Sequence, residues 1–179
     1  MIRYVIPSFQ RPHQLKQKTL RYLGDQGIEN ENIIIVLRND DPYLDRYLEL
    51  GTADESGYQF LMTDVKGIGN THNTITQHFQ EGDFIVEIDD DLTDIIDENR
   101  NSIINFQDEC KRMYNIMIHM GCSYGGTYQC DNPMFMANTP QFTTDLRYML
   151  GCLRFRFIRQ NIVLHTNYAE DMENCILHF

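Results

Sequence analysis

Short apolar runs alternate with amphipathic stretches along the first half of the chain, and glycine, proline or polar clusters separate them. The run Ile33–Leu37 is continuously apolar, which is typical of a strand covered on both faces. The connections are too short to separate domains. This alternation predicts an α/β fold with a mostly parallel sheet and helices on its faces. The expected strands are Ile2–Ile6, Ile33–Leu37, Tyr58–Met62 and Phe84–Ile88, and the expected helices are Pro12–Leu23, Tyr43–Leu50 and Asn70–Gln80.

The second half of the chain has a different pattern. Asn101–Met120 carries apolar residues at helical spacing, so we expect a longer amphipathic helix there. Residues 123–163 are rich in aromatics and glycine, which indicates further, partly antiparallel strands. Another helix is expected to begin at Glu170. Its pattern reaches Phe179 without a glycine, asparagine or proline stop signal, so we expect the natural domain to continue past this residue.

Three consecutive aspartates, Asp89, Asp90 and Asp91, directly follow the apolar run Phe84–Ile88. A strand that ends in this cluster would place the carboxylates at the edge of the sheet where open α/β folds bind ligands. Adjacent anions repel one another, so their folding together favours a nearby cation or strong donors. Mg²⁺ or Mn²⁺ would supply that charge and keep coordination sites for substrate phosphates. The alternative is a solvated acidic turn.

Polar side chains also follow the other expected strands. Pro7, Ser8 and Arg11 come after the first strand, and Arg38–Asp40 comes after the second. In a parallel sheet these loops converge on one crevice with the aspartates. Arginine, amide and carboxylate groups that converge in this way indicate a site for a nucleoside diphosphate.

A glycine-containing turn, Lys66–Asn70, precedes the third helix. Gly67 and Gly69 would let the backbone approach a ligand closely, and exposed N–H groups at Asn70 would favour a phosphate. The alternative is an ordinary turn in which Asn70 caps the helix. The turn therefore supports the proposed site only in combination with the neighbouring loops.

A second carboxylate pair, Glu170 and Asp171, lies at the start of the last expected helix. The helix dipole stabilises acids at that position, so charge compensation is the simpler interpretation. A carboxylate held across a pocket from a metal-bound diphosphate could instead act as a general base. It would then deprotonate an incoming hydroxyl group.

The formal net charge of −11 weighs against nonspecific binding to a polyanion, because phosphate contacts need lysine and arginine. A local cluster of basic residues nevertheless occurs in this acidic chain. It is either a solvated strand face or an anion-binding site. Its members are Arg147, Arg154, Arg156 and Arg159.

The five cysteines are widely spaced and include no Cys-x-x-Cys pair, which fits free thiols in a reducing compartment. No apolar run approaches the roughly 20 residues that a membrane helix needs. The N-terminus enters a strand pattern directly and does not resemble a signal peptide. We therefore expect a cytoplasmic protein without a membrane segment; its oligomeric state stays open.

Two parts of the chain resemble the GT-A glycosyltransferases, which have a Rossmann-like nucleotide-sugar fold and a strand-end DxD motif. Val65–Asn73 followed by Glu81–Asp91 is similar to their glycine–asparagine–helix–strand–DxD order. Further segments resemble the TET/JBP-associated (base J type) DNA glycosyltransferase family, which phages, kinetoplastids and other lineages carry. These segments are Tyr4–Pro12, Asn132–Met136, Thr143–Arg147 and Glu170–Glu173.

The resemblance implies one GT-A domain over residues 1–179, in which a mostly parallel mixed sheet is flanked by helices. Residues 1–95 would form the nucleotide-sugar-binding half and residues 96–179 the acceptor-side half. Asp89 and Asp91 become the metal-binding DxD acids, with Asp91 preferred as the direct ligand and Asp89 nearer the ribose. Asp171, with Glu170, becomes the catalytic base. The nucleotide would contact Pro7, Ser8, Arg11, Asn39, Asp40, Lys66, Gly67, Asn70, Asn73, Asp89 and Asp90.

The resemblance also implies the reaction: inverting, metal-dependent transfer of a sugar from a nucleotide-sugar, preferably a UDP-sugar, with Mn²⁺ or Mg²⁺. The acceptor would be a hydroxymethylated pyrimidine in phage or viral DNA. It would face Gly125, Gly126, the Asn132–Met136 loop and the arginines from Arg147 to Arg159. Two alternatives remain open, a glycosyltransferase that acts on a glycan or protein, and an inactive nucleotide-binding module.

Overall fold

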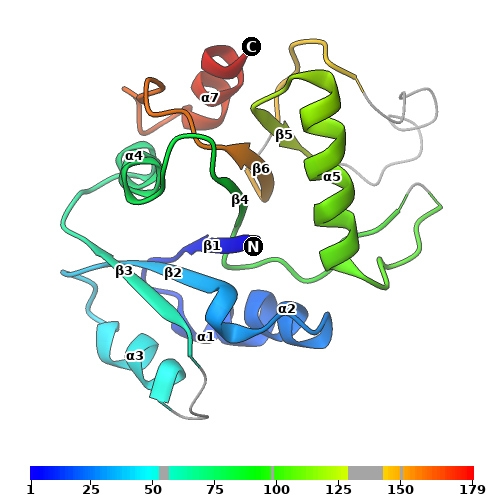
Figure 1. Ribbon diagram of the computed structural model, residues 1–179. Coiled ribbons are helices and arrows are strands. Elements are labelled where there is room, and N and C mark those ends of the chain that lie inside the picture. Colours follow the sequence, from blue (N-terminus) through cyan, green and yellow to red (C-terminus); the bar gives the residue numbers. More distant parts are fainter. Residues whose placement is uncertain (53–56, 98, 129–142, 150) are drawn as a thin grey trace.

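One mixed sheet of six strands, in the order β3-β2-β1-β4-β6-β5, forms the centre of the molecule (Figure 1). The computed structural model describes residues 1–52, 57–97, 99–128, 143–149 and 151–179. The strands are β1 (Arg3–Pro7), β2 (Ile33–Arg38), β3 (Gln59–Thr63), β4 (Phe84–Ile88), β5 (Tyr124–Gly126) and β6 (Leu153–Phe157). The helices are α1 (Pro12–Leu15), η1 (Lys16–Leu20), α2 (Arg21–Asp25), η2 (Asn30–Asn32), α3 (Leu44–Thr52), α4 (Ile68–His78), α5 (Phe106–Met120) and α7 (Glu170–His178).

The first four strands are parallel, as the alternating pattern predicts. β1 lies between β2 and β4, and Val5 is opposite Ile34 of β2 and Glu87 of β4. β3 extends the sheet beyond β2 in the same direction. The helices between consecutive parallel strands return the chain to the start of the sheet. The carboxyl ends of these strands therefore meet at one edge.

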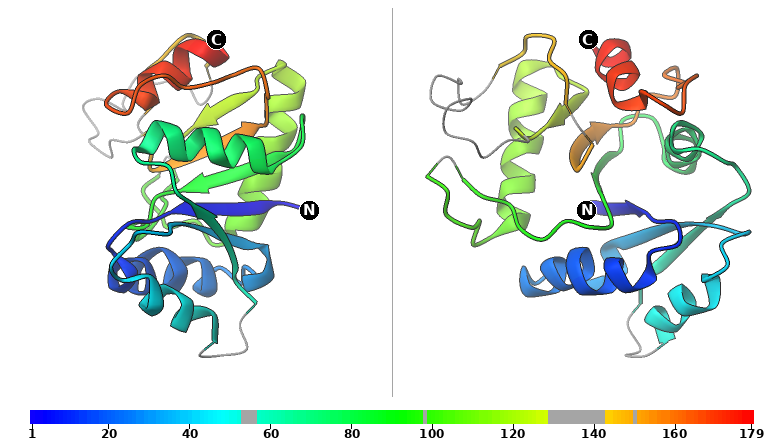
Figure 2. Two further views of the ribbon diagram at one scale, coloured as in Figure 1. Left: turned by 90° about the vertical axis from the view of Figure 1, so that its left-hand side faces the viewer. Right: turned by 180° about the vertical axis from the view of Figure 1, so that it is seen from behind.

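Helices cover the two faces of the sheet (Figure 2). Successive residues of a strand point to opposite faces. Tyr4 and Ile6 of β1 join the larger buried cluster, which contains Leu23 of α2 and Phe106 of α5. Val5 faces the opposite side, where it packs in a smaller cluster with Ile75 of α4. The site at the strand ends thus rests on a sheet that is packed on both sides.

The second half adds β6 and β5 to the sheet as antiparallel strands, as its pattern indicated. α7 begins at Glu170, also as expected. The longer helix starts later than predicted, at Phe106 instead of Asn101. Asn105 caps it by accepting a hydrogen bond from the amide of Asp108, and Ser102 is held in an isolated bridge with Ile96.

The first helical stretch is continuous from Pro12 to Asp25 but contains a five-residue π-helix, η1, in its middle. Thr19 and Leu20 of η1 are buried. Gly27, with φ of 70°, ends the stretch, and the amide of Ile28 bonds the carbonyl of Leu23. The sequence predicted the helix but not this wider turn.

Two further expectations concern cysteines and membrane helices. Cys110, Cys122, Cys152 and Cys175 are free thiols, as expected, whereas Cys130 lies outside the described residues. Within the ranges that the structure describes, no helix combines the length and the apolar character that crossing a bilayer requires.

Candidate functional site

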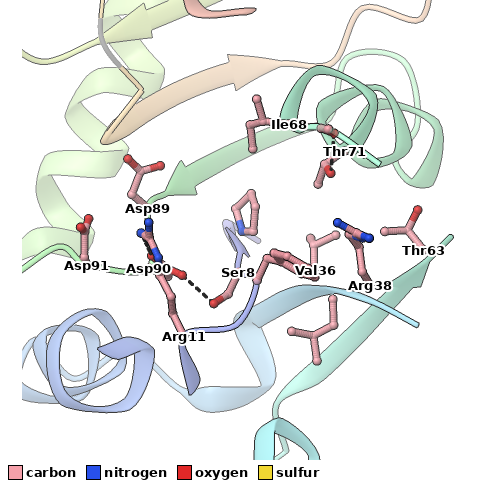
Figure 3. A pocket seen from close by; sticks show the side chains of 14 residues that line it. Ser8, Arg11, Val36, Arg38, Thr63, Ile68, Thr71, Asp89, Asp90 and Asp91 are labelled. Atoms are coloured by element: carbon pink, nitrogen blue, oxygen red, sulfur yellow. Dashed lines mark hydrogen bonds and ion pairs between the residues drawn. The ribbon is translucent and has the colours of Figure 1, made fainter. Parts of the chain in front are cut away.

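A cavity of about 410 Å³ lies at the carboxyl ends of the parallel strands (Figure 3). Pro7 and Ser8 follow β1, and Arg38, Thr63 and Asp89 stand at the ends of β2, β3 and β4. The crossover topology therefore brings together loops that are far apart in sequence. The predicted residues that line the cavity are Pro7, Ser8, Arg11, Arg38, Gly67, Asp89, Asp90 and Asp91. Ile68, within the predicted Lys66–Asn70 turn, lines it too, whereas Phe9, Val36, Leu37, Thr63 and Thr71 were not expected there.

Asp90, the middle aspartate, is 6% exposed and held by the protein itself. Ser8 Oγ donates to its Oδ2 at 2.6 Å, and Arg11 Nη1 lies 3.3 Å from its Oδ1. Ser8 in turn bonds the hydroxyl of Tyr47 at 2.8 Å, which also accepts from the amide of Arg11 at 2.8 Å. Asp90 thus anchors the loop after β1 to the end of β4.

The outer two aspartates, Asp89 and Asp91, point to the same side, away from the bond between Asp90 and Ser8 (Figure 3). Asp91 is exposed, and its Oδ2 accepts one hydrogen bond, from Gln14 at 3.2 Å. Burial raises the pKa of Asp89 to about 6; Arg154 opposes this shift, whereas Asp91, Asp171 and Asp90 add to it. The structure therefore gathers negative charge here that the protein only partly compensates.

A divalent cation fits this donor set. Asp89 and Asp91 offer hard carboxylate oxygens, which Mg²⁺ and Mn²⁺ prefer. In the described part of the chain, no three histidine, cysteine, aspartate or glutamate side chains gather around a common point. Two carboxylates leave coordination positions on such an ion that phosphate oxygens and water would fill.

The other end of the cavity is formed by an aromatic ring and a cation. The guanidinium of Arg38 lies 4.2 Å from the centroid of the Phe9 ring, and its Nη2 donates to Asp40 at 2.6 Å. That hydrogen bond lowers the pKa of Asp40. Lys66 is 3.7 Å from the same carboxylate. Asp40, Lys66 and also Asn39, which bonds Asp64 at 2.7 Å, lie outside the cavity lining.

The glycine turn before α4 packs against a later loop of the chain. Gly67 has φ of 93°, and a Cβ at this position would overlap the side chain of Asn167. A Cβ at Gly69 would overlap the carbonyl oxygen of Thr166. The amide of Asn70 donates to Asn167 Oδ1 at 3.2 Å, so this N–H group already has an acceptor. Because Gly67 and Gly69 have no side chains, the loop that carries Thr166 and Asn167 can pack against this turn. Gly67 also lines the cavity.

Asn73 belongs to the same contact between α4 and this loop. Its side chain donates to the carbonyl of Leu164 and accepts from the amide of Leu164, both at 2.8 Å. Asn70 and Asn73 do not line the cavity. In this structure both residues hold the loop that leads to α7.

Asp171, the predicted base, lies in the first turn of α7 and is 16% exposed. Its Oδ1 is 3.0 Å from Nη2 of Arg154, and its Oδ2 accepts from the amide of Gly151 at 3.2 Å. Neither Asp171 nor Glu170 lines the cavity. The negative charge of Asp171 nevertheless adds to the raised pKa of Asp89.

A buried polar cluster lies between β4, β6 and α4. Glu87 pairs with Nη1 of Arg156 and lies 3.5 Å from Nη1 of Arg154. His72 Nδ1 is 3.0 Å from Glu87, and His72 Nε2 is 2.6 Å from Arg154. Thr76 accepts from Arg156 at 2.6 Å. Burial favours the neutral acid, but the cations around Glu87 outweigh this effect and lower its pKa.

This cluster corrects the prediction that Arg154 and Arg156 face an acceptor; for the exposed Arg147 and Arg159 it stays a prediction. Arg154 and Arg156 are 4% and 3% exposed, because alternate residues of β6 point toward α4 and Glu87 lies on the neighbouring strand. Arg159 pairs with Glu81 at 3.2 Å, and Arg147 lies 3.8 Å from Asp145.

The glycines predicted to face the acceptor lie in β5. A Cβ at Gly125 would lie 3.3 Å from the sulfur of Met117, and one at Gly126 would lie 3.0 Å from that of Met149. Both positions are therefore close to packed side chains. The Asn132–Met136 loop, also predicted to face the acceptor, lies outside the described residues.

Comparisons with known proteins identify the fold. No protein-family model matches the sequence, and no curated protein matches it significantly. Staphylococcus aureus TarS 1–349 in complex with UDP-GlcNAc aligns with a TM-score of 0.62 over 99% of this chain and 52% of its own, at 13% identity. Its UDP complex gives 0.59 over 96% and 52%, at 15% identity. The mannosyltransferase PcManGT from Pyrobaculum calidifontis, with GDP-Man and Mn²⁺, gives 0.57 over 87% and 44%, at 12% identity.

The fold is therefore the GT-A type, with a mixed six-stranded sheet flanked by helices. This confirms the fold class expected from the sequence. At these identities the likeness concerns the fold alone. The chain spans about half the length of the solved structures that it resembles.

Proposed function

We propose that this chain forms the donor-binding part of a metal-dependent glycosyltransferase that uses a nucleotide-sugar, with a UDP-sugar as the first choice. The main support is the acidic turn at the end of β4. There Ser8 holds Asp90, and the side chains of Asp89 and Asp91 point to one side. This turn closes one end of a cavity in a GT-A fold. Of the solved structures with this fold, one was determined with GDP-Man and Mn²⁺ and another with UDP-GlcNAc.

The cavity offers different chemistry at its two ends. Phe9, Arg38 and Thr63 present an aromatic face, a cation and a hydroxyl, which suit a nucleobase and its sugar. Asp89 and Asp91 would hold a divalent cation next to the diphosphate. A cation bound there would neutralise charge on the leaving nucleoside diphosphate.

Asp171 is the residue that we propose as general base, with Glu170 beside it. Inverting transfer needs one carboxylate that accepts the proton of the attacking hydroxyl while the diphosphate leaves from the opposite side. Arg154 and the amide of Gly151 fix the orientation of Asp171. The proposal requires that the acceptor reaches Asp171 from outside the cavity, since Asp171 does not line it.

For the acceptor, the sequence resemblance supports a hydroxymethylated pyrimidine in phage or viral DNA, modified in the host cytoplasm. One observation favours a second candidate, a glycan or protein acceptor. The chain carries a net charge of −11, and Arg154 and Arg156 are buried, which leaves less positive surface for phosphate contacts. An inactive nucleotide-binding module is the third candidate, supported by the position of Asp171 and Glu170 outside the cavity lining.

Isothermal titration with UDP, in the presence and absence of Mn²⁺, tests the donor site. We expect UDP binding that depends on Mn²⁺ in the wild type and is lost in Asp91→Asn. Asp25→Asn, which removes a comparable exposed carboxylate at the end of α2, should bind like the wild type. Binding that is the same with and without Mn²⁺, in both the wild type and Asp91→Asn, would contradict the proposed site.

Transfer assays with a UDP-sugar separate the acceptor classes. Hydroxymethylated DNA, an oligosaccharide and a protein acceptor are offered in parallel. Transfer to DNA supports the first candidate, and transfer to the glycan or protein supports the second. Mn²⁺-dependent UDP binding without transfer or hydrolysis in any arm supports the inactive module.

A further inference from the structure

Thr19 is a fully buried residue of the π-helix η1 that contacts the acidic turn directly. Its Oγ1 donates to the carbonyl oxygen of Asp89 at 2.7 Å. The same oxygen accepts from the amide of Leu92 at 3.0 Å. One hydroxyl group from the first helical stretch therefore satisfies two backbone groups at the end of β4, about 70 residues later in the chain.

These two bonds bridge the ends of a tight turn. Asp90 and Asp91 are its central residues, Asp89 supplies the first carbonyl and Leu92 the last amide. A hydroxyl placed between these two groups fixes their separation, and so fixes the directions in which the intervening side chains point. The bond between Asp90 and Ser8 fixes the turn at a second point.

We propose that Thr19 is a positioning residue that holds Asp89 and Asp91 in the arrangement needed to bind a cation and diphosphate. This inference rests on the proposed function of the same site. Thr19 would contact neither the cation nor the diphosphate. It acts through its bonds to the backbone of Asp89 and Leu92, the residues at the two ends of the turn. Residues that orient metal ligands in this way typically change metal affinity by about 10- to 100-fold when they are replaced.

The local helix geometry supports the same role. A π-helical turn is rare and occurs mostly as a single-turn insertion within an α-helix, frequently at a functional site. No glycine or proline lies in Lys16–Leu20 to cause one. The two bonds of Thr19 to the acidic turn are a tertiary contact that compensates for the wider turn. The π-helix and the acidic turn thus stabilise one another.

The test compares Thr19→Val, which removes the hydroxyl at nearly constant volume, with Thr19→Ser, which keeps it. Thr74→Val serves as the matched control, because Thr74 is also a helical threonine with a hydroxyl that bonds a backbone carbonyl, that of Asn70. Two readouts are measured for each variant: the Kd for UDP with Mn²⁺, and hydrogen exchange at the Leu92 amide without ligand.

We expect Thr19→Val to weaken Mn²⁺-dependent UDP binding by about tenfold or more. Its Leu92 amide should exchange about tenfold faster, since it loses its acceptor. Thr19→Ser should stay within about twofold of the wild type in both readouts, as should Thr74→Val. A merely structural role for the methyl group of Thr19 predicts the reverse order, with Thr19→Ser impaired and Thr19→Val intact, and would overturn the proposal.

The two readouts separate this inference from the proposed function. A wild type that binds no UDP with Mn²⁺ overturns the proposed function and the ligand part of the inference. Faster exchange at Leu92 in Thr19→Val would still support the bridge itself. Unchanged exchange and unchanged affinity in Thr19→Val overturn the inference and leave the proposed function standing. If Thr19→Val does not fold, impairment of Thr19→Ser in both readouts overturns the proposal, and wild-type behaviour supports it.

Discussion

Oδ1 of Asp171 lies 3.0 Å from Nη2 of the buried Arg154, and this pair joins α7 to β6. Arg154 also approaches Glu87, which precedes the acidic turn on β4 by two residues. Gly151 makes room for this arrangement, because a Cβ there would overlap the guanidinium of Arg154. The carboxylate proposed as the base is thus held by the same arginine that lies beside Glu87, two residues before the acidic turn.

Asp171→Asn should leave UDP affinity within about twofold of the wild type and lower the turnover rate by about 10²- to 10⁴-fold. The amide keeps a similar shape but cannot accept the proton of the attacking hydroxyl. Glu170→Gln is the matched comparison and should retain most activity if Asp171 is the base. Steady-state kinetics and UDP titration check both variants. Loss of the fold or of UDP affinity in Asp171→Asn would instead assign Asp171 a structural role.

Glu87→Gln should lower the free energy of unfolding by about 3–5 kcal/mol. The substitution leaves Arg154 and Arg156 buried without their common counter-ion. Urea denaturation measures the change. The control is Glu81→Gln, which breaks an exposed pair with Arg159 and should shift the midpoint much less. Equal shifts in the two variants would show that the buried cluster contributes no more than a surface ion pair.

The stability of the wild type should depend on pH through His72. Burial lowers the pKa of His72, an effect that Glu87 opposes and Arg154 supports. Because the folded pKa lies below the unfolded value of about 6.5, the unfolded chain binds a proton first as the pH falls. His72 therefore destabilises the fold progressively below about pH 6.5, by up to about 1.4 kcal/mol per pH unit.

His72→Gln isolates this contribution, since His178 and Asp89, whose pKa values are also shifted, remain in both proteins. The unfolding free energies of wild type and variant should converge as the pH falls from 7 to 5. Denaturation at three pH values in this range is sufficient. Parallel pH profiles would show that His72 is not held neutral in the fold.

Gly67→Ala should destabilise the protein by more than about 1 kcal/mol. Its φ of 93° disfavours a side chain, and the new Cβ would overlap Asn167. Gly24→Ala is the control, because a Cβ there meets nothing within 4 Å and alanine favours helix α2 by up to about 1 kcal/mol. The midpoint of thermal denaturation should therefore fall in Gly67→Ala and rise in Gly24→Ala. A neutral Gly67→Ala would mean that Asn167 does not pack against this turn.

Much of the fold could be predicted because parallel strands have a strong local pattern. Ile33–Leu37 and Phe84–Ile88 are apolar runs that the sheet buries, and the topology then places Asp89 at the strand-end edge. The start of α5 could not be read with the same accuracy. It is set by the Asn105 cap, and the apolar residues Ile103 and Ile104 just before this cap are compatible with an earlier start.

The site could be predicted only where it depends on strand ends. Arg154 and Arg156 resembled an exposed cluster because their partner, Glu87, is more than 60 residues away in sequence. Gly67 and Gly69 resembled a ligand-binding turn because nothing local reveals that Asn167 and Thr166 pack against it. Thr19 carries no motif at all, since its role depends on the π-helical turn and on a contact with a distant strand end.

Crystals grown with UDP and Mn²⁺ would show whether Asp89 and Asp91 bind a cation next to the nucleotide. Diffraction data collected at the manganese absorption edge locate the ion by its anomalous signal, independently of the nucleotide. We expect a manganese peak beside the carboxylates of Asp89 and Asp91, with the diphosphate bound to the same ion. Nucleotide bound without an ion beside residues 89–91, or a manganese peak only elsewhere on the protein, would contradict this expectation.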